Sequence, residues 1–254
     1  MSWSSKQYRM FEDQRTRPVR DLVAAIATEN VRNAVDLGCG PGNSTDVLAQ
    51  RFPAAHITGL DSSADMLSDA RKRLPALDFE LADIADWTPA EPVDVILANA
   101  SLQWLPDHAA LYPRLIKQLA AGGTLAVQTP DNLEEPAHRL ARQVAAQGPW
   151  AGRIGNLQHP DRHRPAFYYQ LLAPHCSVVD VWTTTYFHPL EGGHEAVVEW
   201  FKGSALRPYL QALDTQEQRA FLAAYLGEIR RAYPALTDGT VLLPFPRLFI
   251  VAMR

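Results

Sequence analysis

The sequence predicts an α/β fold built on a mostly parallel β-sheet with helices on both faces. Apolar runs of strand length alternate with segments of helical periodicity from about residue 17 to residue 128. Strands that are joined by helices pair in parallel, and the helices cover both faces of the sheet. A glycine-rich turn over residues 38–42 follows the first strand. Ligands of such sheets bind outside the carboxyl ends of the strands, so this turn is the expected ligand site.

The first half of the chain supplies five of the expected strands and most of the helices that cover them. Apolar runs predict strands at residues 34–37, 57–60, 78–81, 93–98 and 124–128. Helical spacing predicts helices at residues 43–52, 64–74 and 109–120, the last ending at a Gly122-Gly123 C-cap. An earlier helix is expected to open at Arg17-Pro18, because proline is favoured in the first turn of a helix.

The second half predicts two late strands separated by a helical block. The strands are expected at residues 177–187 and 246–253, which gives a seven-stranded sheet in total. Helices are expected at residues 135–146, 166–172, 194–201, 206–213 and 216–233, and a loop at 148–165. We interpret the chain as a single domain, 1–254, with a helical cap inserted before the last strand. Its predicted parts are an N-terminal lid, a cofactor-binding core, a substrate-side loop and strand, and the cap, at residues 1–30, 31–130, 131–187 and 188–240.

Composition narrows the possible partners and the compartment. A chain of 254 residues with 47% hydrophobic content can bury a large core. The net charge of -4 and a pI near 6.1 disfavour nucleic acid as a partner, because binding phosphates needs clustered Lys and Arg. Cys39 and Cys176 form no disulfide framework. No apolar run approaches the ~20 residues of a membrane span, and the amino terminus has no signal-peptide pattern, so we expect a cytoplasmic protein without membrane contact.

The glycine turn predicts a nucleoside ligand that carries no phosphates. Its spacing is G-x-G-x-G, and Asn43 stands where a dinucleotide fingerprint carries its third glycine. A pyrophosphate on the following helix is therefore poorly supported. Asp61, at the end of the second strand, can accept hydrogen bonds from both ribose hydroxyls. The alternative for Asp61 is an ordinary helix N-cap, because Asp61-Ser62-Ser63 precedes a helix.

Five sequence blocks in order resemble the class I S-adenosylmethionine-dependent methyltransferase family. The blocks are residues 35–42, 59–63, 82–84, 97–105 and 119–127, and the resemblance runs from about residue 32 to residue 128. It implies a Rossmann-like methyltransferase fold and S-adenosyl-L-methionine as cofactor, with S-adenosyl-L-homocysteine as product. The residues that it places at the cofactor are Asp36, Gly38, Gly40, Gly42, Asp61, Ser62, Met66, Asp83, Ile84, Asn99, Ala100 and Ser101.

The resemblance also implies which part of the cofactor each of these residues contacts. Asp83 accepts from the adenine amino group, the Ile84 backbone N–H meets a ring nitrogen, and Met66, Ile84 and Trp104 supply apolar faces for the purine. The segment 99–101 approaches the methionine part, and Asp36 holds its ammonium through water. The alternative for Asp36 is a strand-end carboxylate that accepts from nearby backbone N–H groups. Cys39 is interpreted as a small filler between glycines and not as a nucleophile.

Basic residues after Gly148 point to an anionic substrate. They are Arg153, His159, Arg162, His163, Arg164, Lys202, Arg207 and Arg247. Most are expected to be surface charges, but Lys202, Arg207 and Arg247 stand among apolar neighbours, where a charge needs a partner or a ligand. Tyr8, Arg17 and Trp200 complete the expected substrate site. For Arg17, helix-start chemistry beside Pro18 is the alternative.

The amino-terminal segment and the segments 200–210 and 245–249 are similar to carboxyl methyltransferases of a small polycarboxylic acid within that family. This resemblance implies an O-methyltransferase that forms a monomethyl ester, with positioning residues, no catalytic side chain and no metal. The alternatives are a methyltransferase of another carboxylate such as a fatty or malonyl acyl group, a nicotinamide oxidoreductase, and a non-catalytic S-adenosylmethionine-binding module. The sequence leaves the choice between monomer and homodimer open.

Overall fold

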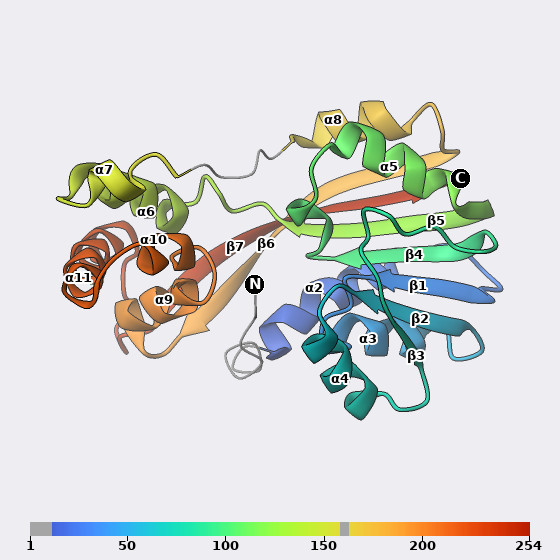
Figure 1. The fold of residues 1–254 in the computed structure, drawn as a ribbon, viewed down its shortest axis with the longest axis horizontal. Helices are drawn as coiled ribbons and strands as arrows, with labels where there is room; N and C mark the ends of the chain where they lie inside the picture. The colour runs from blue at the N-terminus through green and yellow to red at the C-terminus, as the bar shows by residue number, and fades with distance from the viewer. Residues whose placement is uncertain (1–11, 158–162) are drawn as a thin grey trace. The chain divides into compact units, whose positions relative to one another are not determined.

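The computed structural model describes residues 12–157 and 163–254, and the backbone alone for residues 12–15. Its sheet has seven strands in the order β3-β2-β1-β4-β5-β7-β6 (Figure 1). The strands from β1 to β5 pair in parallel, and β7 pairs antiparallel with β5. The predicted seven-stranded, mostly parallel sheet is confirmed. The strands are β1 Asn33–Leu37, β2 His56–Asp61, β3 Asp78–Leu81, β4 Val93–Asn99, β5 Leu119–Pro130, β6 Val178–Leu190 and β7 Val241–Met253.

Helices separate the first five strands along the chain, as the α/β prediction requires, except that β3 is followed directly by β4. The helices are α2 Glu12–Ala24, α3 Asn43–Arg51, α4 Ala64–Arg73, α5 His108–Lys117, α6 Pro136–Gln147, α7 Ala151–Ile154, α8 Pro165–Leu172, α9 Gly193–Lys202, α10 Arg207–Gln211 and α11 Thr215–Ala232. A short 3-10 turn, η1 Leu102–Trp104, precedes α5. The helices α9, α10 and α11 follow β6 and precede β7 in the chain, so the predicted helical insertion before the last strand is present.

The chain separates into two compact units. The sheet unit contains the described residues up to 130, residues 163–184 and residues 247–254. The helical unit contains residues 131–157 and 185–246 of the described chain. The helical unit therefore takes in α6 and α7 as well as the insertion expected at residues 188–240. None of the described helices combines the length and apolar character that a membrane span needs.

Three sequence expectations about helices are wrong. Helix α2 begins at Glu12, so Pro18 lies inside the helix and not in its first turn. Helix α5 ends at Lys117, and Gly122-Gly123 lie within β5, which begins at Leu119. The expected loop at 148–165 contains the short helix α7. Apolar residues at the end of α5 and the start of β5 fit either element, so local pattern could not place that boundary.

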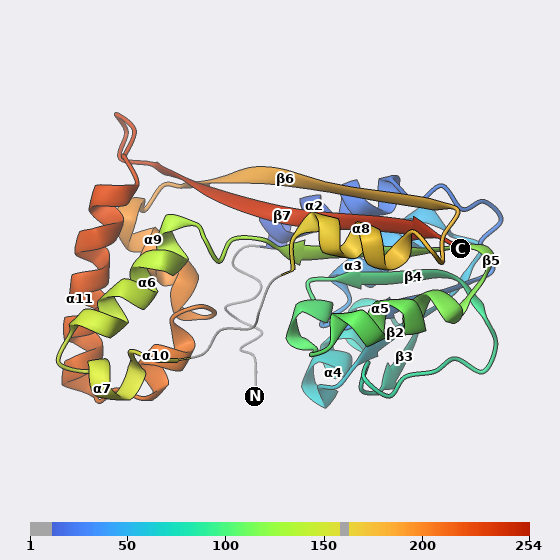
Figure 2. The same cartoon turned by 90° about the horizontal axis from the view of Figure 1, so that it is seen from above.

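The two faces of the sheet carry different side chains. One face bears apolar residues such as Leu37, Ile96 and Val127, which pack with α5 and α8 in one buried cluster. The helices α5 and α8 lie beside each other in both Figure 1 and Figure 2. The opposite face is contacted by α2 and α3. Burial of both faces explains why the central strands β1, β4 and β5 are rich in apolar residues, whereas the edge strands β3 and β6 are largely exposed.

The face toward α2 and α3 also bears four polar side chains that we call the polar row. Asp36 pairs in register with Leu97, and Asn99 lies two residues further along β4 on the same face. Asn99 pairs with Gln128, which in turn pairs with Phe249, two residues after Arg247. The polar row is therefore Asp36, Asn99, Gln128 and Arg247, one residue from each of β1, β4, β5 and β7. Asp36, Gln128 and Arg247 are buried, and Asn99 is partly buried.

The helical unit packs α6 and α9 against α11, and these helices lie side by side in Figure 2. Two tyrosines form hydrogen bonds with the backbone of one residue of α6, Ala137. The Tyr225 hydroxyl donates to the Ala137 carbonyl oxygen at 3.0 Å, and the Ala137 N–H donates to the Tyr233 hydroxyl at 2.9 Å. Burial raises the pKa of Tyr233 to about 12 and that of Tyr225 further still. Both hydroxyls are therefore protonated at neutral pH.

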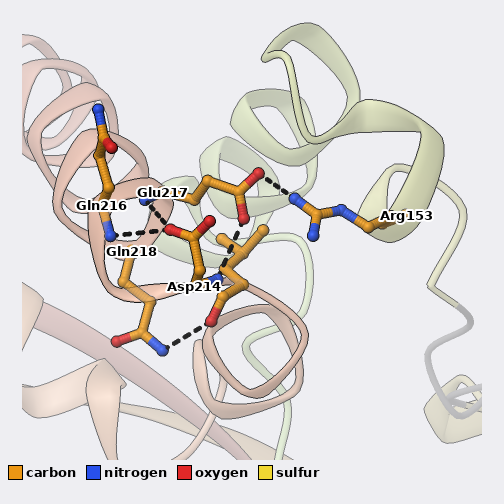
Figure 3. A network of polar contacts seen from close by, with 6 residues as sticks. Arg153, Asp214, Gln216, Glu217 and Gln218 are labelled. Atoms are coloured by element: carbon orange, nitrogen blue, oxygen red, sulfur yellow. Dashed lines mark hydrogen bonds and ion pairs between the residues drawn. The ribbon is translucent and has the colours of Figure 1, made fainter.

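The amino terminus of α11 is fixed by a capping box, shown in Figure 3. The Asp214 carboxylate accepts from the backbone N–H groups of Gln216 and Glu217 at 2.8 and 2.9 Å. The Glu217 carboxylate accepts from the Asp214 backbone N–H at 3.1 Å and also pairs with Arg153 of α7. Arg153 is thus part of a structural network that satisfies the free N–H groups at a helix start.

We expect Asp214→Ala to lower the free energy of unfolding of the helical unit by about 1 kcal/mol, because two backbone N–H groups lose their acceptor. The measurement is urea unfolding followed by far-ultraviolet circular dichroism. Gln216→Ala is the control, since the capping box uses only the backbone of Gln216. Equal midpoints for the Asp214 and Gln216 variants would show that the cap contributes nothing.

Candidate functional site

The glycine turn joins β1 to α3 and is held against the end of β2. Gly38, Gly40 and Gly42 have φ values of +75°, +55° and +88°, a left-handed backbone conformation that only glycine adopts easily. The backbone N–H groups of Gly38 and Cys39 both donate to the Leu60 carbonyl oxygen, at 2.7 and 2.8 Å. These bonds place the turn at the carboxyl ends of β1 and β2.

Asp61 closes the same junction from β2. Its Oδ2 accepts from the Gly40 N–H at 2.9 Å, and its Oδ1 accepts from the Ser63 N–H at 2.8 Å. The residue that caps α4 is Ser63, whose hydroxyl accepts from the Met66 N–H, so the N-cap alternative for Asp61 is wrong. A carboxylate offers about four lone-pair sites. Asp61 therefore keeps capacity for two further donors, which is what its predicted contact with ribose requires.

Asp36 is fully buried in β1 and accepts from two hydroxyls of α3. Its Oδ2 lies 2.7 Å from both Ser44 Oγ and Thr45 Oγ1, so the alternative of backbone N–H partners does not describe these contacts. Its Oδ1 is buried without a hydrogen-bond partner among the described residues. Burial raises the pKa of Asp36 to about 6, against the lowering effect of the two hydroxyls. The orphaned oxygen is suited to a cationic donor, directly or through water.

Gly38 marks a point where three loops meet. A Cβ on Gly38 would lie 2.4 Å from the Ser101 Cβ and 3.5 Å from Ile84 Cδ1. The Ser101 hydroxyl donates to the Leu37 carbonyl oxygen at 2.6 Å, which binds the loop after β4 to the end of β1. The predicted cofactor residues Gly38, Ile84 and Ser101 are therefore brought together, although they come from three separate parts of the chain.

The end of β4 has an unusual backbone. Ala100 has a φ of +54°, a conformation that costs a non-glycine residue roughly 1–2 kcal/mol. Its N–H donates to the Gln128 carbonyl oxygen, and its own carbonyl oxygen accepts from Gln103 Nε2, both at 2.8 Å. Asn99 Oδ1 is buried with no hydrogen-bond partner in the part of the chain that the structure describes. Held strain beside an orphaned polar atom is typical of a binding site.

The residues expected around the adenine are spread over α4 and two loops. Met66 is buried, Ile84 is partly buried against the apolar cluster, and Trp104 is 62% exposed. Ser62 and Asp83 are exposed, and Asp83 Oδ1 accepts from the Ala85 N–H at 2.8 Å. The loop that carries Asp83 and Ile84 is fixed by α5. Arg114 donates to the carbonyl oxygens of Ile84 and Trp87, both at 2.8 Å.

The expected substrate residues fall into both units. Arg247, in the sheet unit, is 5% exposed and donates through Nη1 to Gln128 Oε1 at 2.9 Å. Arg17 is exposed on α2, away from the helix start, so the helix-start alternative is wrong. Tyr8 lies outside the described residues, as do His159 and Arg162.

The helical unit holds the remaining expected substrate residues. Trp200 is buried with its ring stacked on His188 at 4.8 Å between centroids. Lys202 is partly buried and pairs with Glu199 one turn earlier in α9. Arg207 is partly buried at the start of α10. Glu199 therefore compensates part of the positive charge of Lys202, for which the sequence analysis expected an anionic ligand as partner.

Neither cysteine is an activated nucleophile. Burial beside Asp36 and Asp61 raises the pKa of the Cys39 thiol far above neutral pH, and burial also raises the pKa of Cys176. A thiol in this state is protonated and unreactive. In the described part of the chain, no group of three or more His, Cys, Asp or Glu side chains is arranged to hold a metal ion.

Sequence reasoning missed several residues that shape the site. Ser44 and Thr45 bind Asp36, Arg114 fixes the Ile84 loop, and Gln128 binds Arg247. Gln128 had a detectable signal, because a glutamine inside the apolar strand run of residues 124–128 is unusual. The roles of Ser44, Thr45 and Arg114 depend on contacts across the fold, which no local pattern reveals.

A sheet of this strand order with a glycine turn after β1 defines a class I methyltransferase domain. A family model described as "Methyltransferase domain" matches residues 29–169, more than half of the chain. A trans-aconitate 2-methyltransferase of Methylobacterium radiotolerans is 53% identical, covering 99% of this chain and 98% of the relative. Proteins of the same name from Variovorax paradoxus and Agrobacterium fabrum are 50% and 49% identical over 100% of this chain, covering 99% and 100% of those relatives. This chain therefore belongs to the trans-aconitate 2-methyltransferase family of methyltransferases.

Solved structures agree with the fold. The YcgJ protein from Bacillus subtilis matches with a TM-score of 0.61 at 10% identity, covering 94% of this chain and 98% of that one. The plantazolicin methyltransferase BpumL, in complex with a triazolic desmethylPZN analog and SAH, matches with a TM-score of 0.53 at 17% identity, covering 98% of this chain and 90% of that one. At these identities, the likeness concerns the fold alone.

We expect Asp36→Asn to stabilise the protein at neutral pH by up to about 3 kcal/mol. The pKa of Asp36 is raised from 3.8 to about 6. Between these two pH values the folded state binds more protons than the unfolded state. The free energy of unfolding of the wild type therefore falls as the pH rises from about 4 to about 6, and it falls no further from this cause at higher pH. Asparagine keeps an acceptor for Ser44 and Thr45 and removes the buried charge.

The measurement is urea unfolding of the wild type and Asp36→Asn from pH 4 to pH 8. The difference between the two is expected to grow up to about pH 6 and then stay constant. Asp180→Asn, an exposed carboxylate on β6, is the control. A variant less stable than the wild type at pH 7.5 would contradict the unfavourable burial of the charge.

Proposed function

We propose that this protein is a carboxyl O-methyltransferase that transfers a methyl group from S-adenosyl-L-methionine to one carboxylate of trans-aconitate. The products are the monomethyl ester and S-adenosyl-L-homocysteine. The proposal is supported by full-length relatives of that name at 49–53% identity. The single structural observation that supports an anionic substrate is the buried Arg247 at the carboxyl end of β5, beside Gln128. A guanidinium in this position favours a carboxylate ligand.

The residues of the sheet unit fit S-adenosyl-L-methionine. The positive-φ glycine turn leaves room for close approach, since a Cβ on Gly40 would meet nothing within 4 Å. Asp61 would accept from the ribose hydroxyls, and Asp83 from the adenine amino group. Asp36, with its orphaned Oδ1, would hold the ammonium through water, and residues 99–101 would lie along the methionine part. When bound, the cofactor supplies a methyl group made electrophilic by the sulfonium.

The protein needs no general base for this reaction. A carboxylic acid has a pKa near ~4 and is ionised at neutral pH, so the attacking oxygen is already an anion. The side chains therefore act by holding the substrate in line with the methyl group and by excluding water. A guanidinium bonded to the attacking oxygen would withdraw its electron density. Arg247 is accordingly assigned to a carboxylate that does not react.

Other expected substrate residues stay proposals. Lys202, Arg207 and Trp200 of the helical unit are proposed to contact substrate, together with Tyr8 and Arg17 of the amino-terminal segment. For Lys202, this contact requires the ammonium to exchange its present partner, Glu199, for a substrate carboxylate or to bind both. The cytoplasmic location and the choice between monomer and homodimer also stay predictions.

The function is tested by incubating the protein with S-adenosyl-L-methionine and a panel of mono-, di- and tricarboxylic acids, followed by mass spectrometry. We expect a product heavier than trans-aconitate by one methylene unit, because one acid hydrogen is replaced by a methyl group. A cofactor labelled in the methyl group provides the control for methyl origin. An ester that forms on another acid, while trans-aconitate stays unchanged, would identify a different substrate.

We expect Arg247→Ala to weaken trans-aconitate binding by roughly 1–3 kcal/mol, because charge-assisted hydrogen bonds are lost. The readouts are kcat/KM and calorimetric affinity in the presence of S-adenosyl-L-homocysteine. Arg230→Ala is the matched control, since Arg230 is an exposed arginine paired with Glu195. An unchanged kcat/KM in Arg247→Ala would remove this residue from the substrate site.

A further inference from the structure

The polar row contains a glutamine, Gln128, to which the proposed function assigns no direct contact with the substrate. Gln128 is fully buried in β5, next to Asn99 of β4 in register and diagonal to Arg247 of β7. Side chains diagonal to each other on one face of a sheet are within reach when they are long. The contact between Gln128 Oε1 and Arg247 Nη1, at 2.9 Å, lies within the sheet unit.

The orientation of the Gln128 amide is determined by its partner. A guanidinium has only donors, so the atom that faces Arg247 Nη1 must be the amide oxygen. The amide nitrogen then points away from that contact. This Nε2 is buried and has no hydrogen-bond partner among residues 12–157 and 163–254. A buried N–H donor without an acceptor is costly, and it indicates that an acceptor is present when the site is in use.

The chemical identity of residue 128 matters because the amide is neutral. An amide oxygen can orient the guanidinium without cancelling its charge. A glutamate of the same length would form a buried ion pair with Arg247 and would place a negative charge beside the substrate. A methionine of similar length would leave the charge of Arg247 in place but would neither orient the guanidinium nor offer an N–H.

We propose that Gln128 is a specificity-determining residue for the carboxylate substrate. Its amide oxygen orients Arg247 while leaving that residue cationic, and its amide N–H is a second donor to the anion that Arg247 binds. This inference rests on the proposed function. It assigns to Gln128 the selection of an anionic ligand, which neither the glycine turn nor the cofactor residues can supply.

The test compares the wild type with Gln128→Glu and Gln128→Met. Trans-aconitate binding is measured by calorimetry on the protein saturated with S-adenosyl-L-homocysteine, alongside KM, kcat and the melting temperature. We expect Gln128→Glu to raise Kd and KM at least 30-fold, and Gln128→Met about tenfold, with kcat at saturating substrate changed less than threefold. The melting temperature of Gln128→Glu is expected to match or exceed that of the wild type, because the glutamate pairs with Arg247.

Gln170→Glu, an exposed residue of α8, controls for the added charge and is expected to bind as the wild type does. A folded Gln128→Glu with Kd within threefold of the wild type would overturn the inference. If the glutamate variant fails to fold, an unchanged Kd in Gln128→Met would overturn it equally. Failure of the proposed function is distinct, because then the wild type itself would neither bind nor esterify trans-aconitate.

Discussion

The geometry of the candidate site depends on the way the glycine turn folds back on β2. Two consecutive N–H groups of the turn share the Leu60 carbonyl oxygen, and a third donates to Asp61. These bonds require the left-handed backbone at Gly38 and Gly40, which a side chain would oppose. They hold the turn against the end of β2, and a separate bond from Ser101 to Leu37 joins the loop after β4 to the end of β1. The other site residues are positioned separately, the loop of Asp83 and Ile84 by Arg114 and the side chain of Arg247 by Gln128.

The polar row shows how an apolar sheet accommodates charge at one point. Asp36 is buried against two hydroxyls, and Arg247 is buried against a neutral amide. Buried ionised groups are unfavourable unless partners compensate them. The orphaned atoms Asp36 Oδ1, Asn99 Oδ1 and Gln128 Nε2 lie along the same face of three adjacent strands, within the described part of the chain. This part of the sheet is therefore less well satisfied than its apolar face, as is expected where a ligand completes the structure.

Much of the architecture was accessible from local pattern. The strand at residues 78–81 is β3 without change, and the other predicted parallel strands differ from the observed ones mainly at their ends. The helix expected at 109–120 was predicted to extend too far at its carboxyl end. The apolar segment Leu119–Val127 fits either a helix or a strand, and it is a strand because it pairs with β4 and β7. Pro18 does not mark the start of a helix, because α2 already begins at Glu12.

The sequence by itself determined the fold class, the glycine turn and the acidic residue at the end of β2, because these depend on backbone conformations and residue spacings that are local. The tertiary structure decided which partners the buried polar groups have. Ser44 and Thr45 with Asp36, Arg114 with Ile84, and Gln128 with Arg247 are pairs that form only after strands and helices from different parts of the chain have packed together. Charge and hydrogen-bond complementarity across a sheet depends on strand register and on burial. Neither the register nor the burial can be predicted from the residues of one segment alone.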